Sequence, residues 1–152
     1  MTCQRIVIVG MPGAGKSTLC ARLGKRFNIP YYHLDYYAWE GGVLVDAPIL
    51  EHHVDTIVET PSWVVDGTYT KTLDQRLARA DVLIVLTDAR WRCILRVMRR
   101  YLKGRHHPQI GDNPHIISFE FIRYIWNYER DVKPKIDQIY QRHAHTCRLC
   151  QW

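Results

Sequence analysis

The segment Gly10–Thr18 constrains the fold more than any other part of this sequence. Its letters, GMPGAGKST, fit the phosphate-binding loop pattern G-x-x-x-x-G-K-[ST] at every fixed position. Before it, Arg5–Val9 is a short apolar run of the kind found in a strand buried on both faces. After it, Leu19, Leu23 and Phe27 recur at helical spacing. We therefore expect a strand, a phosphate-binding loop, and a helix that begins within the loop.

The residue types in this loop explain how it would hold a triphosphate. Glycines let successive backbone N–H groups point into one concavity, and the helix N-terminus adds partial positive charge there. Lys16 is placed to reach the β- and γ-phosphates, and the Ser17 hydroxyl to ligate Mg²⁺. A glycine-rich turn that binds nothing is disfavoured by the flanking strand and helix patterns. The predicted nucleotide-binding residues are Gly10, Pro12, Gly13, Ala14, Gly15, Lys16, Ser17 and Thr18.

Length and composition describe a small globular protein. With 152 residues, 47% of them hydrophobic and 24% charged, the chain is expected to form one domain spanning 1–152. No apolar run approaches the roughly 20 residues of a membrane span, and the apolar N-terminal segment is too short for a signal peptide. The cytoplasm is thus the expected location, with the five cysteines reduced. A net charge of +6 permits a nucleic-acid partner and suits a triphosphate equally well.

Two carboxylates follow short predicted strands. Asp35 ends the Tyr31–Leu34 run, and Asp66 ends Ser62–Val65. Ligands of open parallel sheets lie beyond the carboxyl ends of the strands, so Asp35 is placed to orient or deprotonate an acceptor hydroxyl. A capping role for Asp35 is an equally good interpretation. Asp66 has the form of a Walker B carboxylate that holds Mg²⁺, although a strand-end turn would also use an Asp-Gly pair, here Asp66 and Gly67.

Strands alternate with helices along the chain, which predicts a doubly wound α/β sheet. The strongest strand signal, residues 81–86, is followed by an arginine-rich predicted helix. The basic residues on one face are Arg92, Arg96, Arg99 and Arg100, with Arg105 just beyond, and the predicted buried side holds Ile94, Leu95, Val97, Met98 and Leu102. These arginines could clamp transferring phosphates, bind nucleic acid, or form a solvated surface.

Other segments carry weaker signals. Residues 36–47 are expected to form an irregular loop, and 103–118, with two Gly and two Pro, a mobile lid. A long helix should then follow, interrupted at Pro134. The tail holds His143, His145, Cys147 and Cys150 in eight residues, but a single C-x-x-C is a weak zinc signal, and a fifth strand is the preferred interpretation.

Taken together, these landmarks resemble the P-loop nucleoside and nucleotide kinases of the adenylate-kinase-like branch. More narrowly, they resemble the DNA topology modulation (FlaR-like) family. The matching segments are Gly10–Thr18, Tyr32–Asp35, Trp63–Tyr69, Leu73–Asp81, Asp88–Trp91 and Ile125–Asn127. The sequence departs from these relatives at Thr68, where they usually have Asn. It also ends at Trp152, whereas they continue into a segment that helps to hold the adenine base.

The resemblance implies a three-layer P-loop fold with a five-stranded parallel sheet in the order 2-3-1-4-5 and a lid after the fourth strand. It implies ATP and Mg²⁺ as cofactors, with Asp66 and Gly67 in the Asp-Gly pair that positions Mg²⁺. Arg96, Arg100 and Arg105 match the catalytic lid arginines by region only. Arg76 is a candidate for contact with an acceptor phosphate.

We therefore expect an ATP-dependent kinase that acts on a small acceptor such as a nucleoside or nucleotide, with Lys16, Asp35 and the arginines as catalytic residues. One rival is a nucleotide-binding regulator that acts on DNA through the basic helix. Another is a catalytically silent fold that still binds ATP. The direction of the arginines, toward the loop or outward as a stripe, distinguishes the first two.

Overall fold

The computed structural model describes residues 4–103 and 117–152, so Arg105 and most of the predicted lid lie outside the described residues. Its main sheet has five strands in the order β2-β5-β1-β6-β7, and every neighbouring pair is parallel. Counted along the chain, this is the predicted order 2-3-1-4-5. The strands are β1 Arg5–Gly10, β2 Tyr31–His33, β5 Trp63–Asp66, β6 Val82–Leu86 and β7 Arg148–Gln151.

Helices cover both faces of the sheet, because the strand residues alternate between two apolar layers. Ile6 and Ile8 of β1 pack with Cys20 of α1 on one face. Val7 and Val9 pack on the other face, in the larger core. The helices are α1 Lys16–Phe27, α2 Leu34–Ala38, α3 Ala47–Val58, α4 Leu73–Leu77, α5 Arg90–Leu102, α6 Phe119–Asp131 and α7 Lys133–Gln141, with a 3-10 turn at Thr70–Thr72.

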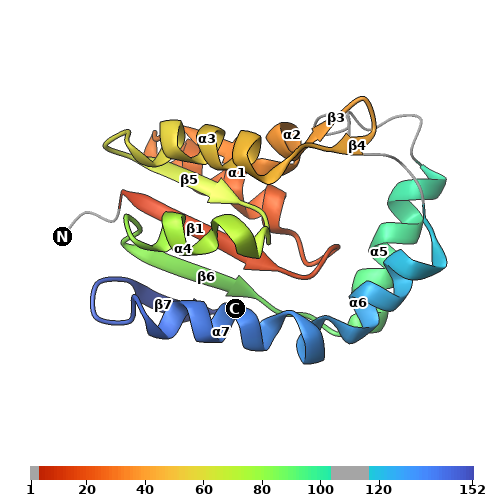
Figure 1. Cartoon of the computed structure of the whole chain (residues 1–152). Coiled ribbons are helices and arrows are strands. Elements are labelled where there is room, and N and C mark those ends of the chain that lie inside the picture. The colour runs from red at the N-terminus through yellow and green to blue at the C-terminus, as the bar shows by residue number, and fades with distance from the viewer. Residues whose placement is uncertain (1–3, 104–116) are drawn as a thin grey trace.

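The helices α5 and α6 stand beyond the carboxyl ends of the strands, where the ligand of a parallel sheet is expected (Figure 1). This position explains a wrong prediction about α5. Leu95, Met98 and Leu102 are not on a buried side: they are 49%, 44% and 80% exposed. Only Cys93 and Val97 of this helix are buried, because a helix at the end of the sheet meets the core along a narrow stripe.

Of two further predictions, the first is wrong and the second is confirmed. Residues 36–47 are not an irregular loop, since they include most of α2 and a hairpin formed by β3 Trp39–Glu40 and β4 Val43–Leu44. The tail does form the predicted fifth strand, and Cys147 before it is buried. Within residues 4–103 and 117–152, no helix is both long and apolar enough to cross a bilayer.

Candidate active site

The loop between β1 and α1 has the backbone that a phosphate-binding loop requires. Gly10, Gly13 and Gly15 have φ values of 153°, 83° and 95°, which residues with a side chain rarely adopt. A Cβ on Gly13 would lie 2.5 Å from the carbonyl oxygen of Cys93, so the loop packs directly against α5. The N-cap residue of α1 is Gly15, and within the described part of the chain no side-chain hydrogen bond caps this helix. The first N–H groups of this helix are thus available to an anion.

Lys16 lies at the centre of the charged groups around this loop. Its Nζ donates a hydrogen bond to the carbonyl of Met11 at 3.1 Å, which holds the side chain folded back over the loop. Burial lowers the pKa of Lys16, and the nearby Arg100 lowers it further, while Asp66 and Asp35 act in the opposite direction. Both predicted carboxylates and one predicted arginine are therefore close enough to the loop lysine to affect its charge.

Asp66 ends β5 beside the loop, as predicted, and is only 3% exposed. Its Oδ2 lies 2.9 Å from His33 Nδ1, because parallel pairing sets His33 at the end of β2 directly opposite Asp66. This hydrogen bond raises the pKa of His33. With the Ser17 hydroxyl on the adjacent α1, the Asp66 carboxylate offers the oxygen donors that Mg²⁺ prefers. The residues present thus fit a magnesium-bound triphosphate.

The turn after Asp66 is tied to the phosphate loop by Thr68. Its Oγ1 accepts a hydrogen bond from the amide of Gly10 at 3.2 Å and lies 2.8 Å from the Gly10 carbonyl, to which it donates. Gly67 has a φ of 130°, and a Cβ there would lie 2.9 Å from the side chain of Leu34. Gly67 therefore lets the turn after Asp66 pack closely against Leu34. The backbone of this turn forms that part of the site.

Arg76 does not occupy the predicted position at an acceptor phosphate. It is fully buried, and its guanidinium donates to the carbonyls of Gly67 and Tyr69, each at 2.9 Å, and of Thr72 at 3.3 Å. Burial lowers the pKa of Arg76 to about 9. Its donors are occupied by the backbone, so this arginine holds the segment after β5 in place.

The arginines of α5 differ in the groups that they contact. Arg96 donates to the carbonyl of Gly13 at 3.2 Å and forms an ion pair with Asp88 at 2.6 Å. Arg100 acts on Lys16 as described above. Arg92 lies over the ring of Trp91, 5.2 Å from its centroid, and also forms an ion pair with Asp88 at 3.6 Å. The two described members of the predicted catalytic trio thus lie on the loop side of the helix.

Asp35 lies in a hydrogen-bonded network that the sequence did not indicate. It is the second residue of α2 rather than a strand end. Its Oδ1 accepts a hydrogen bond from the Tyr69 hydroxyl at 2.6 Å, and Trp39 Nε1 donates to the same hydroxyl at 3.2 Å. Burial and the neighbouring Asp35 raise the pKa of Tyr69, so the phenol keeps its proton. Tyr69 therefore fixes one oxygen of Asp35.

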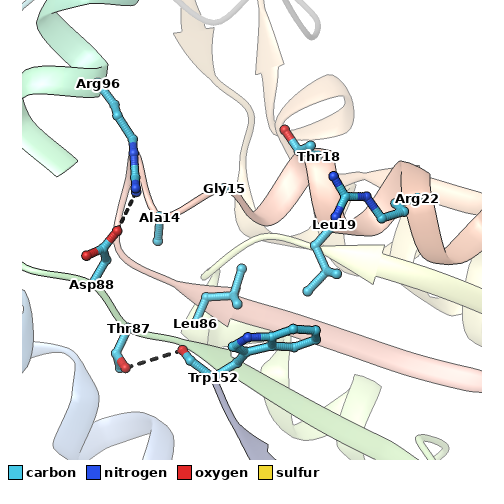
Figure 2. A pocket seen from close by; sticks show the side chains of 10 residues that line it. All are labelled: Ala14, Gly15, Thr18, Leu19, Arg22, Leu86, Thr87, Asp88, Arg96 and Trp152. Atoms are coloured by element: carbon cyan, nitrogen blue, oxygen red, sulfur yellow. Dashed lines mark hydrogen bonds and ion pairs between the residues drawn. The ribbon is translucent and has the colours of Figure 1, made fainter. Parts of the chain in front are cut away.

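A pocket of about 500 Å³ opens next to the phosphate loop, between α1 and the end of β6 (Figure 2). Trp152 lies at its floor, next to Leu86 and opposite Leu19 and Arg22 of α1. The Trp152 backbone extends the sheet, because its amide donates to Val85 and its carbonyl accepts from Thr87. The remaining lining residues are Ala14, Gly15, Thr18, Thr87, Asp88 and Arg96. The pocket joins the end of the phosphate loop to a flat aromatic surface.

Trp152 and Tyr69 are the main site residues that were not predicted. Trp152 follows the fifth strand, so the rule that ligands lie beyond the carboxyl ends of parallel strands could have indicated it. Tyr69 follows a strand end by three residues, and nothing in the sequence indicates its contact with Asp35.

Two solved structures similar to this chain are described as kinases. One is a "putative kinase" from Chloroflexus aurantiacus J-10-fl, with a TM-score of 0.55 and 15% identity over 92% of this chain and 98% of that chain. Another is shikimate kinase from Acinetobacter baumannii in complex with shikimate, with a TM-score of 0.61 and 14% identity over 91% of this chain and 80% of that one. At these identities the likeness establishes the three-layer parallel fold.

No protein-family model matches the chain, and no curated protein matches it in sequence. The narrower resemblance to the DNA topology modulation family therefore stays a prediction.

Proposed function

We propose that this chain is a Mg²⁺- and ATP-dependent phosphotransferase that acts on a small acceptor with a hydroxyl or phosphate group. The observation that carries this proposal is the arrangement around Lys16. Its ammonium lies next to an uncapped helix N-terminus, within the field of Asp35, Asp66 and Arg100. The two similar solved structures are both described as kinases, which supports the same proposal.

In this proposal each group has one role. The loop amides and Lys16 hold the β- and γ-phosphates, and Ser17 and Asp66 hold Mg²⁺, which neutralises charge on the phosphates when bound. Asp35 accepts the proton of the acceptor hydroxyl or orients it, with Tyr69 keeping the carboxylate in place. Arg96 and Arg100 stabilise the charge that develops on the transferring group. Most of the rate enhancement would come from positioning and electrostatics.

The pocket at Trp152 is proposed to hold the nucleobase. It begins at Ala14 and Gly15, where a triphosphate on the loop would end, and it offers an indole face. Base–aromatic stacking is favourable for every base, so this surface would bind ATP without strong base selectivity. The arginine direction supports the kinase rather than the DNA-binding rival, because Arg96 is bonded to the loop itself.

The proposal is tested by an acceptor screen that measures ADP production in the presence of Mg²⁺ and ATP. Activity with one acceptor class should fall at least 100-fold in Asp66→Asn, a change of about 2.7 kcal/mol in transition-state stabilisation. A detected activity that stays at the wild-type level in Asp66→Asn would remove the magnesium role of Asp66. If no acceptor raises ADP release above background, the silent, ATP-binding fold becomes the better account.

A further inference from the structure

Three side chains with metal-binding atoms meet under the phosphate loop. They are Cys20 of α1, His33 at the end of β2 and Asp66 at the end of β5. The pairing register places His33 opposite Asp66, and both side chains point to the face of the sheet that α1 covers, where Val64 packs beside Cys20. The topology therefore brings a thiol, an imidazole and a carboxylate to one point.

We propose that this cluster is a binding site for a divalent transition-metal ion of the zinc class. The donor atoms of the three residues all lie within 4.8 Å of one another. In a tetrahedral zinc site with bonds of about 2.0–2.3 Å, donors lie roughly 3.5 Å apart, so shifts of about 1 Å would complete the site. Three protein ligands would leave the fourth position for water, as in open zinc sites.

The donor set selects the ion. Mg²⁺ and Ca²⁺ prefer oxygen ligands, whereas a thiolate and an imidazole favour Zn²⁺ and related ions.

Cys20 is fully buried, and its Sγ lies 3.7 Å and 3.8 Å from the carbonyls of Tyr32 and Val64. Binding would release the thiol proton to solvent, leave the His33 ring neutral with its one proton on the nitrogen that does not bind the ion, and replace the hydrogen bond between His33 and Asp66. His33 is partly exposed, with 19% of its side chain accessible, and gives the ion a way in.

This site has a regulatory consequence that rests on the proposed function. A zinc-class ion held by Cys20 and His33 would take the Asp66 carboxylate that the catalytic Mg²⁺ requires. Zinc would then inhibit phosphoryl transfer without blocking the phosphate loop. Metal binding itself does not depend on kinase activity, so the two proposals can fail separately.

Cobalt(II) provides the test, because it occupies zinc sites and gives a thiolate-to-metal absorption band in the near ultraviolet. We would titrate the metal-free, full-length protein with Co²⁺ in the absence of nucleotide. The wild type should show this band at one equivalent, Cys20→Ser should lose it, and His33→Asn should bind Co²⁺ at least tenfold more weakly. Zn²⁺ should displace the cobalt and abolish the band.

Cys93→Ser and Cys150→Ser are the matched controls and should keep the band, since Cys93 is also buried and Cys150 belongs to the C-x-x-C of the tail. Circular dichroism would show that each variant is folded, and His33→Asn provides a second route if Cys20→Ser is not. A band that survives in Cys20→Ser, or that is lost in Cys150→Ser instead, would overturn the assignment. So would a wild type without a band. If Co²⁺ binds as expected but no kinase activity exists, the metal site stands and the proposed function falls.

Discussion

The two sides of the candidate site are built in different ways. On the nucleotide side, a continuous loop from Gly10 to Ser17 offers backbone N–H groups, and Gly13 packs against α5 with no room for a side chain. On the proposed acceptor side, Asp35 and Trp39 of one segment and Tyr69 of another meet through side-chain hydrogen bonds to the Tyr69 hydroxyl. A site made of backbone N–H groups suits the phosphate chain, which is the same in every kinase. A site made of side chains can come to bind a different acceptor through single substitutions.

The largest loss of stability is expected for a substitution at Gly13, where the loop backbone meets α5. Gly13→Ala would place a Cβ 2.5 Å from the Cys93 carbonyl at a φ of 83°. We expect the free energy of unfolding to fall by about 3 kcal/mol, from strain and the clash together. Gly15→Ala, at a φ of 95° with open space around its Cβ, should cost only about 1–2 kcal/mol. Urea titrations measure both, and equal losses would contradict the close packing of loop and helix.

Arg76 tests how the acceptor side is held in place. Arg76→Met would leave the buried carbonyl of Gly67 without its guanidinium donor, whereas the Tyr69 carbonyl would keep its hydrogen bonds from Thr72. We expect a loss of about 2–3 kcal/mol in the free energy of unfolding, the usual effect of unsatisfied buried acceptors. Arg79→Met, an exposed arginine three residues further on, should change stability by less than about 0.5 kcal/mol. If instead Arg76→Met is stable and loses only acceptor affinity, the phosphate-contact role predicted for Arg76 is restored.

Tyr69→Phe removes the hydrogen bond to Asp35 and should separate the two sides. We expect about 1 kcal/mol of lost stability, unchanged ATP affinity, and a higher KM for the acceptor. Tyr140→Phe is the matched variant, because that hydroxyl donates to the Cys147 carbonyl at 3.0 Å, in the C-terminal segment. It should lose similar stability and leave the KM for the acceptor alone. A change in ATP affinity in Tyr69→Phe would show that the two sides are not independent.

The smallest effect is expected at the nucleobase. Trp152 is 72% exposed, so Trp152→Ala should weaken ATP binding about fivefold, or roughly 1 kcal/mol. The affinity for tripolyphosphate, which lacks a base, should not change. Trp91→Ala, also exposed but outside the pocket lining, serves as the control. Equal losses for ATP and tripolyphosphate would place the base elsewhere.

The difference between a continuous loop and a side-chain network explains which parts of the site could be predicted from the sequence. The loop was predicted residue by residue because its glycines, Lys16 and Ser17 are adjacent in the chain and each has a local reason. The position of Asp66 at the end of a strand was predicted because an apolar strand followed by Asp is also a local pattern. The partner of Asp35 was not, since Tyr69 reaches it only through tertiary packing.

The errors have the same origin. Arg76 was given a role in acceptor binding because the sequence does not reveal that the backbone of 67–72 surrounds its guanidinium. Leu95 was placed in the core because the helical period gives the faces of α5 but not the position of that helix beyond the sheet. Strand order came from a family resemblance, not from the residues themselves.

The most direct test of the account is calorimetric titration of the wild type and Lys16→Ala with ATP, with and without Mg²⁺. A charged hydrogen-bonding group is worth about 1.5–3 kcal/mol, so Lys16→Ala should bind ATP roughly 10- to 150-fold more weakly. The wild type should bind more tightly with Mg²⁺ than without it. Equal ATP affinities in the two proteins, or no binding by the wild type, would contradict the central claim that Gly10–Ser17 holds a triphosphate.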